Sequence, residues 1–242
     1  MVDVNALATA NAKRWAAAQP TRNFSSIAKR LVEAKERYRA VEAKTGVPWF
    51  VIAVIHMRES SQSWSRSLAQ GDPIDRVSVH VPAGRGPFAS WEAAAIDALA
   101  NCHPFLARKK NWSLGPTLAN LELYNGAGYA SKGRPSPYVW AGTDQYISGK
   151  YVSDGKYDPN HVDTQPGCAA LIKEMIRLDP SIKFGMSTTA KVGSTTAVVV
   201  GTAGGAAAAA SAGWSWVEVG LTALIAAGII TAIVFFIKKV RS

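Results

Sequence analysis

The chain has 242 residues, which is enough for one domain of about 150 residues with additional segments at its ends. Its formal net charge of +10 is concentrated at the ends. Residues 1–46 hold nine basic and four acidic side chains, a balance of +5, and residues 185–242 hold four basic and one acidic, a balance of +3. Residues 47–184 hold fourteen basic and twelve acidic side chains, a balance of +2. The excess of positive charge at the ends suggests attraction to an anionic surface such as cell wall or lipid headgroups. The nearly balanced centre, without a zinc-finger spacing, an RNP-like motif or a sustained basic helix, argues against nucleic acid as a partner.

Residues 1–24 are small, polar and basic, and they lack an apolar core long enough for a signal sequence. We expect them to form a basic N-terminal arm, and we do not expect ordinary secretion from this end of the chain. Residues 25–44 predict one amphipathic helix with a basic outer face, which Ser25 or Ser26 would cap. Its apolar positions recur at helical spacing: Ile27, Leu31, Ala34, Tyr38 and Val41.

An apolar run in the next segment ends in the carboxyl group of Glu59. Gly46 can close the preceding helix and Pro48 suits a first helical turn, so the pattern predicts a buried helix that delivers one acid to a cleft. Because low-dielectric neighbours disfavour ionisation, we expect the pKa of Glu59 to be raised. A carboxyl group that stays protonated near neutral pH can serve a glycosidase as general acid. The alternative is that Glu59 only pairs with Arg58 or Arg66 at the surface.

Residues 60–88 contain too many glycines and prolines for a long helix. Within them, Arg76–Val81 alternates polar and apolar side chains, which predicts a short strand or hairpin. Three helices are predicted beyond this region. Ser90–Asn101 has a capping serine and strong helix formers, Ser113–Tyr124 has leucines at helical spacing, and Thr164–Leu178 closes the domain.

The helix ending at Tyr124 is followed by Asn125 and Gly126, where the backbone can turn and approach a ligand closely. Residues 130–160 are rich in aromatic side chains, whose apolar faces and polar tips suit stacking on sugar rings. The alternative for each of them is that it fills a loop-rich core. The group comprises Tyr138, Trp140, Tyr146, Tyr151 and Tyr157.

The composition changes towards the C-terminus. Residues 185–213 are rich in Ala, Gly, Ser, Thr and Val and predict a flexible linker. Residues 219–237 carry no charge and would extend roughly 28 Å as a helix, close to the hydrocarbon thickness of a bilayer, about 30 Å. Two tryptophans precede this run and three basic residues follow it, as at a transmembrane helix. We therefore expect residues 25–184 to form the catalytic domain and residues 214–242 a membrane anchor with a basic tail, a buried soluble helix being the alternative.

Neither the cysteines nor the histidines predict a cofactor. Cys102 and Cys168 have apolar or small neighbours, which favours two buried thiols over a disulfide. The four histidines show no pair at metal-ligand spacing, and the segment from His56 to Glu59 lacks the second histidine of a zinc protease motif. We predict no metal site and no other cofactor.

An ordered series of motifs runs through the chain: Arg58-Glu59-Ser60, Gly71-Asp72-Pro73, Val79 to Arg85, Trp91-Glu92, Ala95 to Leu99, Tyr124 to Tyr129 and Ser136 to Trp140. This series resembles the phage-type peptidoglycan hydrolases (endolysins and virion-associated lysozymes) of the lysozyme and lytic transglycosylase superfamily. The likeness covers about residues 30–182 and implies a mainly α, lysozyme-like α+β fold with two lobes around a glycan-binding cleft. It implies cleavage of the MurNAc-GlcNAc backbone of peptidoglycan strands, with Glu59 as general acid. Tyr124, Asn125 and Gly126 resemble the Tyr-Asn-Gly element that lines the cleft of soluble lytic transglycosylases. We also expect Ser60, His80, Tyr129 and Tyr138 to bind substrate.

The resemblance leaves the second half of the reaction open. Lytic transglycosylases usually carry a Gly-Leu-Met-Gln element after the acid, whereas this chain has Gly71-Asp72-Pro73 and the segment around His80. If Asp72 or Asp75 faces Glu59 across the cleft, hydrolysis can follow with inversion or retention. If neither does, the substrate must close on itself to 1,6-anhydro-MurNAc. We favour hydrolysis; a non-catalytic wall-binding module and a membrane assembly protein are the alternatives from other classes.

The basic C-terminal tail predicts a cytoplasmic terminus, so the catalytic domain would face the periplasm and the cell wall. No signal sequence is predicted that would carry the domain across a membrane. We therefore expect a phage protein that reaches the wall in a virion, or through a membrane already breached at lysis. Contact of residues 219–237 with membrane lipid would then hold it in place.

Overall fold

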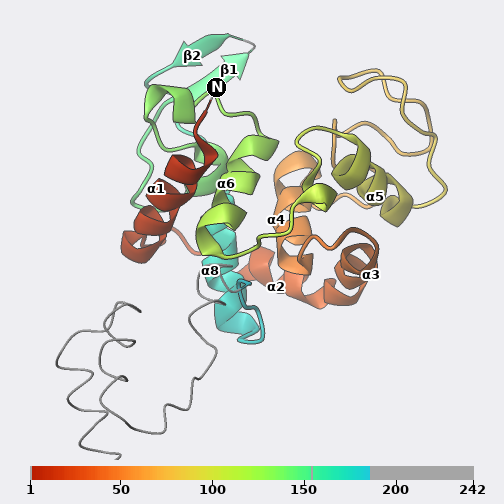
Figure 1. The fold of residues 1–242 in the computed structure, drawn as a ribbon, viewed down its shortest axis with the longest axis horizontal. Coiled ribbons are helices and arrows are strands. Elements are labelled where there is room, and N and C mark those ends of the chain that lie inside the picture. Colours follow the sequence, from red (N-terminus) through yellow and green to blue (C-terminus); the bar gives the residue numbers. More distant parts are fainter. Residues whose placement is uncertain (1, 154, 186–242) are drawn as a thin grey trace, which may run out of the picture. The chain divides into compact units, whose positions relative to one another are not determined.

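The computed structural model describes residues 2–153 and 155–185, which form a mainly helical fold with one two-stranded antiparallel hairpin (Figure 1). The helices in these ranges are α1 (Val4–Ala17), α2 (Ser25–Glu33), α3 (Lys35–Thr45), α4 (Trp49–Ser60), α5 (Trp91–Asn101), α6 (Leu114–Tyr124), α7 (Pro137–Trp140) and α8 (Cys168–Leu178), with the short 3-10 helices η1 (Leu106–Arg108) and η2 (Ala130–Lys132). The hairpin consists of β1 (Lys150–Ser153) and β2 (Lys156–Asp158). The predicted mainly α fold with a short hairpin is confirmed.

Helix α4 lies at the centre of the core, between α6 and the pair α3 and α5 (Figure 1). Gly46 ends α3 in a left-handed conformation, φ 71°, which glycine adopts at no steric cost, and Pro48 directly precedes the first turn of α4. Every side chain from Trp49 to Met57 is buried, and α4 contacts α2, α3, α6 and α8. The predicted buried helix is thus confirmed, and it carries Glu59 in its last turn.

The single helix expected over residues 25–44 is instead two helices that meet at Ala34. Helix α2 packs against α8, whereas α3 packs against α4 and α5, so one straight helix could not cover both surfaces. Ala34 has φ −86° and ψ 9°, outside the regular helical values, although its N–H still bonds to Arg30. The expected serine cap is also absent from α2, because the hydroxyl of Ser25 donates to Glu174 of α8.

The N-terminal segment is not a separate arm as predicted, because α1 packs along α6 as part of the domain. Asn11 of α1 is 2% exposed, donates to Glu122 (3.1 Å) and accepts from the indole N–H of Trp140 (3.2 Å). The two helices approach closely at Gly115, where an added Cβ would lie 2.6 Å from the carbonyl oxygen of Ala8. The domain therefore includes residues 4–17, and its N-terminal boundary precedes residue 25.

The helices predicted after residue 88 are present, with one shifted start. The hydroxyl of Ser90 accepts from the N–H of Ala93 at the start of α5, as a capping serine should, and α6 begins one residue after Ser113. Helix α8 begins at Cys168 instead of residue 164, because Gly167 first pairs its N–H with the carbonyl of Ala141, at 2.7 Å. Both cysteines are buried free thiols, which confirms that prediction.

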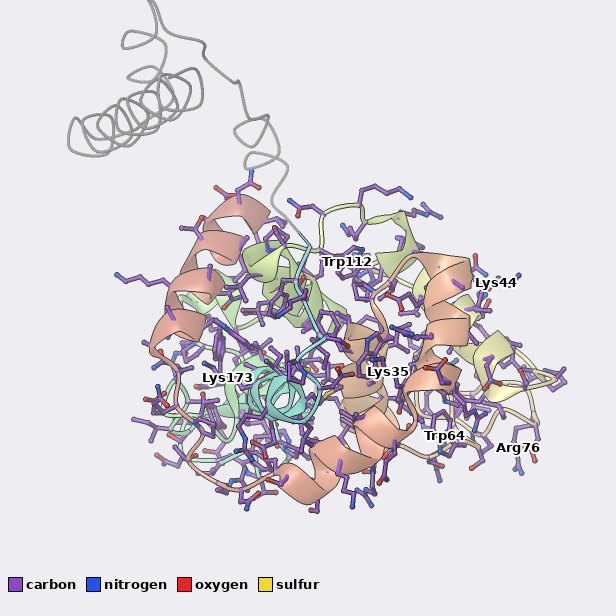
Figure 2. All side chains as sticks on the ribbon, turned by 90° about the horizontal axis from the view of Figure 1, so that it is seen from below. Lys35, Lys44, Trp64, Arg76, Trp112 and Lys173 are labelled. Carbon is purple, nitrogen blue, oxygen red and sulfur yellow. The ribbon has the colours of Figure 1, made fainter. Side chains whose placement is uncertain are left out.

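The strand predicted at Arg76–Val81 is wrong, because this segment is a loop. The valines of the alternating pattern, which were expected to face the core, face solvent instead. Ser78 is buried, whereas Val77, Val79 and Val81 are 50%, 78% and 89% exposed. The backbone N–H groups of this segment bind a carboxylate and a loop carbonyl in place of a neighbouring strand. Arg76 lies at the outer edge of the resulting loop (Figure 2). The hairpin occurs instead at β1 and β2, after α7.

Nearly all of the expected linker (185–213) and the whole expected membrane anchor (214–242) lie outside the described residues. Within the described ranges, no helix by itself has both the length and the apolar character needed to cross a bilayer. Helices α3 and α4 reach the length and apolar composition of a membrane span only when they are taken together, and the chain bends by 111° between them.

Candidate active site

The carboxyl group of Glu59 lies at the C-terminal end of α4, partly exposed and in contact with α7. The hydroxyl of Tyr138 donates to Oε1 of Glu59 at 2.7 Å. Burial raises the pKa of Glu59 from 4.5 to about 7, although the Tyr138 hydrogen bond and the nearby charge of Arg58 each lower it. At neutral pH a large fraction of Glu59 is therefore protonated and able to donate a proton.

Two tyrosines from different helices surround this carboxyl group. Tyr138 of α7 is 2% exposed, and Tyr124 at the end of α6 donates its hydroxyl to the carbonyl of Leu68 (3.0 Å). The pKa of each tyrosine is raised, first by burial and then by the charge of Glu59, so both remain protonated donors. Tyr138 was expected to stack on a sugar, but its burial makes it a hydrogen-bond donor that orients Glu59.

Arg58 does not form the surface ion pair that was the alternative for Glu59. Its buried guanidinium donates to Asp163 at 2.9 Å and lies 4.8 Å above the ring of Tyr138. Lys150 of β1 contacts the other oxygen of Asp163 at 3.2 Å. Asp163 was missed by the sequence analysis, because nothing in the chain around it indicates a partner 105 residues away. The second candidate partner, Arg66, donates to the carbonyl of Gly71.

The carboxylate of Asp72 organises the loop after α4. It accepts the N–H groups of Val79 (2.9 Å) and His80 (3.0 Å), and its second oxygen lies 2.5 Å from Nδ1 of His80. These bonds, those of His80 first, hold the pKa of Asp72 below its ordinary value. Asp72 directly follows Gly71, where an added Cβ would lie 3.3 Å from the carbonyl oxygen of Glu59. An ionised carboxylate therefore belongs to the segment that packs against the end of α4.

Asp75, the other candidate for the second carboxylate, is on the surface. Its side chain is 72% exposed and pairs with neighbouring Arg76 at 3.2 Å. Ser60, a predicted binding residue, donates its hydroxyl to the carbonyl of His56 within α4. Neither side chain has a described contact with the carboxyl group of Glu59.

His56 lies one turn before Glu59 in α4 and supports the segment that follows the helix, a role that was not predicted from the sequence. Its ring is fully buried; Nδ1 accepts from the hydroxyl of Tyr38 (3.0 Å) and Nε2 donates to the carbonyl of Ser63 (2.9 Å). Burial lowers the pKa of His56 to about 4, so the ring is neutral at physiological pH. Its bonds hold the turn that follows Glu59, in which Ser61 and Gln62 have left-handed φ of 54° and 65°.

A cavity of about 330 Å³ brings together several of the predicted binding residues. Asn125, Gly126 and Tyr129 lie on it, whereas Glu59 and His80 do not. Its remaining wall comes from Arg58 and from the hairpin side of the domain. The full lining is Arg58, Asn125, Gly126, Gly128, Tyr129, Pro137, Lys150, Tyr151, Ser153, Gly155 and Asp163.

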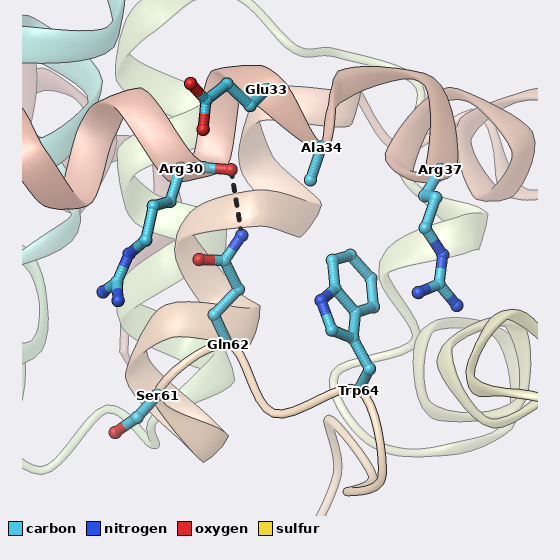
Figure 3. A pocket seen from close by; sticks show the side chains of 7 residues that line it. All are labelled: Arg30, Glu33, Ala34, Arg37, Ser61, Gln62 and Trp64. Carbon is cyan, nitrogen blue, oxygen red and sulfur yellow. Dashed lines mark hydrogen bonds between the residues drawn. The ribbon is translucent and has the colours of Figure 1, made fainter.

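A larger cavity, of about 500 Å³, lies where α2 meets α3 (Figure 3). Gln62 reaches into it and donates to the carbonyl of Arg30 at 3.1 Å, while Trp64 and Arg37 form the opposite side. It is lined by Arg30, Glu33, Ala34, Arg37, Ser61, Gln62 and Trp64, none of which was predicted to bind substrate. The smaller cavity is the better candidate for substrate, because its wall includes Arg58, whose guanidinium lies over the ring of Tyr138, the residue that donates to Glu59.

The hydrogen bond from Tyr138 gives a test of the local electrostatics. Because it favours the ionised form of Glu59, Tyr138→Phe should raise the pKa of Glu59 above about 7 and move the alkaline limb of the activity profile to higher pH. Activity measured across a pH series would detect the shift. Tyr157→Phe, which removes a hydroxyl bonded to Arg134, is the matched control and should leave the limb in place. A limb that moves to lower pH would contradict this arrangement.

The described residues contain no group of three or more His, Cys, Asp or Glu side chains arranged to hold a metal ion. Comparisons with protein-family models, with curated proteins and with solved structures found no match for this chain.

Proposed function

We propose that the chain is a peptidoglycan-degrading glycosidase that cleaves the MurNAc-GlcNAc backbone, with Glu59 as general acid. One observation carries the proposal: the carboxyl group of Glu59 has a pKa raised to about 7 and is held by a buried tyrosine at the end of a core helix. This is the protonation state that a glycosidase needs to protonate the leaving oxygen of a glycosidic bond. The helical fold with a hairpin is compatible with the two-lobed lysozyme-like architecture that the motifs suggest.

Asp72 supplies the second half of the preferred reaction. Its pKa is lowered while that of Glu59 is raised, and two carboxyl groups with pKa values pushed apart are typical of an acid paired with an ionised stabiliser or base. In this scheme Glu59 protonates the leaving oxygen, the Asp72 carboxylate stabilises the oxocarbenium-like transition state, and water completes hydrolysis.

A lytic transglycosylase is the second candidate. Asp72 already accepts two backbone N–H groups and contacts His80, and Asp75 lies on the surface. These engagements favour a reaction in which Glu59 acts without a second carboxylate and the muramyl residue closes to 1,6-anhydro-MurNAc.

Mass spectrometry of the muropeptides released from purified peptidoglycan tests both candidates. Hydrolysis yields reducing ends, whereas transglycosylation yields anhydro ends that are lighter by one water. The Glu59→Gln chain is the control for contaminating activity. Intact glycan strands after prolonged digestion by the wild-type chain would reject the proposed function.

The two aspartates provide a matched pair for the mechanism. If Asp72 stabilises the transition state, Asp72→Asn should lower the cleavage rate by about 10²-fold, the scale for removing one oriented electrostatic group. Asp75→Asn should leave the rate unchanged, because the Asp75 side chain is 72% exposed and pairs with its neighbour Arg76. Both rates are measured with folding monitored by circular dichroism. Equal rates for the two variants would remove Asp72 from the mechanism.

We also propose that residues 219–237 attach the chain to membrane lipid, with the catalytic domain on the side of the cell wall. The apolar, uncharged composition of that segment and the basic residues after it support this proposal. The full-length chain should then require detergent for extraction from a membrane fraction. Recovery of the chain in the aqueous phase without detergent would contradict membrane attachment.

A further inference from the structure

The smaller cavity, which is lined by Arg58, has more cationic than anionic side chains among its described lining residues. Arg58 and Lys150 are cationic and Asp163 is the one anion, which leaves a balance of +1. The charges of Asp163 and Arg58 offset one another, with side chains only 1% and 6% exposed. Lys150 is 31% exposed and lies farther from Asp163, at 3.2 Å. Its ammonium group is therefore the cation that a ligand in the cavity can reach.

Arg58 gives a second observation that points to a ligand, independent of the charge of the cavity. Its Nε–H is buried and has no hydrogen-bond partner within the described part of the chain, although the other two guanidinium nitrogens donate to Asp163 and to the carbonyl of Pro166. A buried charged donor left unpaired is costly, so its position at the wall of an open cavity is consistent with completion by an acceptor on a ligand.

The remaining walls suit a small polar group attached to a sugar. Asn125 offers an amide, and Gly126 and Gly128 leave the backbone exposed beside the cavity. Tyr151 lies next to Gly128 in this wall, since an added Cβ at Gly128 would lie 3.4 Å from its ring. Tyr129 fixes this wall by accepting the N–H of Tyr151 at 2.9 Å.

Tyr138 connects the cavity to the acid. Its ring lies under the guanidinium of Arg58, while its hydroxyl donates to Glu59. A group bound against Arg58 would therefore lie one side chain away from the group that protonates the leaving oxygen. In peptidoglycan every second sugar carries a lactyl ether with a carboxyl group, free or extended by a stem peptide that has carboxylates of its own, whereas a chitin chain carries none.

We infer that this cavity binds a carboxylate of the muramyl residue, through the ammonium group of Lys150 and the free Nε–H of Arg58. This inference rests on the proposed function and adds its substrate class: the chain selects carboxylate-bearing muramyl glycans over uncharged N-acetylglucosamine polymers. Charge-assisted bonds to a carboxylate are stronger than neutral ones, so Lys150 contributes discrimination as well as affinity.

The test measures binding to the full-length Glu59→Gln chain, which does not turn over its ligands, by isothermal titration calorimetry. The probes are chitotetraose, the alternating GlcNAc-MurNAc tetrasaccharide with free lactyl carboxylates, and the same tetrasaccharide bearing stem peptides. Lys150→Met should weaken binding of one or both carboxylate probes about tenfold or more and leave chitotetraose unchanged. The probe that loses affinity identifies whether the lactyl group or the stem peptide supplies the carboxylate.

Two variants control for a structural effect of Lys150. Lys150→Arg keeps the charge and should restore binding, while Lys156→Met, in the partner strand and outside the cavity lining, should change no affinity. Equal loss for all three probes, no loss for any of them, or no binding of either carboxylate probe before substitution would overturn the inference. The proposed function fails separately, if wild-type chain releases no muropeptides while the binding pattern is retained.

Discussion

Glu59→Gln is expected to lower peptidoglycan cleavage by about two to four orders of magnitude, the usual contribution of a required general acid. The amide keeps the size of the side chain and can still accept the hydroxyl of Tyr138, so the fold around α4 should be preserved. Cleavage is measured as release of soluble muropeptides under matched conditions. Retention of more than about a tenth of the wild-type rate is incompatible with acid catalysis by this residue.

The same substitution has a predictable effect on stability. The pKa of Glu59 is raised from 4.5 to about 7 in the folded chain, so the folded state binds the proton more tightly than the unfolded state. This contribution to stability is fully present below pH 4.5 and is lost as the pH rises through about 7. In Glu59→Gln the free energy of unfolding should therefore fall less between pH 5 and pH 8 than in the wild-type chain.

Denaturant unfolding at several pH values measures this difference. Glu36→Gln is the matched control, because the side chain of Glu36 is 83% exposed and its contact with Arg39 is long, at 3.8 Å. Its pH dependence should follow that of the wild type. If both variants follow the wild type, Glu59 does not have the raised pKa on which the proposed acid depends.

Signals within a few residues of a helix end were enough to predict several helices. Gly46 and Pro48 define the start of α4, and Ser90 caps α5, because a cap satisfies backbone groups only one turn away. The break at Ala34 could not be predicted in the same way. It results from two different packing partners, α8 on one side and α4 with α5 on the other, which the helical spacing of one segment does not reveal.

The errors at the N-terminal end of the predicted domain and in the loop both arise where polar contacts, and not an apolar face, fix the chain. Helix α1 docks through the buried polar Asn11 and the close approach at Gly115, so it lacks the apolar stripe from which helix packing is predicted. The alternation in Arg76–Val81 was correct as a pattern, but periodicity does not specify which face is buried. The N–H of Val79 donates to the carboxylate of Asp72, and in this conformation the side chain of Val79 lies in solvent.

The candidate site could be predicted only in part for a similar reason. Glu59 stands out because a carboxyl group ends an apolar run, and Asn125 and Gly126 stand out as a helix stop. The role of Tyr138 depends on a contact across 79 positions of the chain, and the role of Asp163 on one across 105. No local signal encodes contacts of that range, so the position of the Glu59 carboxyl group at the end of a buried helix was predicted, but its contact with Tyr138 and the Arg58–Asp163 ion pair were not.

Asp163→Ala is expected to destabilise the domain by about 3–5 kcal/mol, the typical result of removing one partner from a buried ion pair. The variant leaves the Arg58 guanidinium, which is 6% exposed, without its charge partner, and it removes a contact of Lys150 and an acceptor for the N–H of Gln165. A loss of that size is a large part of the total stability of an ordinary domain, about 5–15 kcal/mol. Denaturant unfolding at neutral pH measures it directly.

The pH dependence and a double variant separate the ion pair from simple loss of packing. Burial alone would raise the pKa of Asp163, but the charge of Arg58 and its hydrogen bond outweigh burial and hold the pKa below 3.8. The pair therefore stabilises the fold above that pH, and its contribution is lost as the pH falls below 3.8 through the folded pKa. Because Arg58→Met with Asp163→Leu removes both charges together, the double variant should be less destabilised than the sum of the two single variants. If the losses of stability in the two single variants add up in the double variant, and stability falls at low pH as it does in the wild type, the pair contributes only packing.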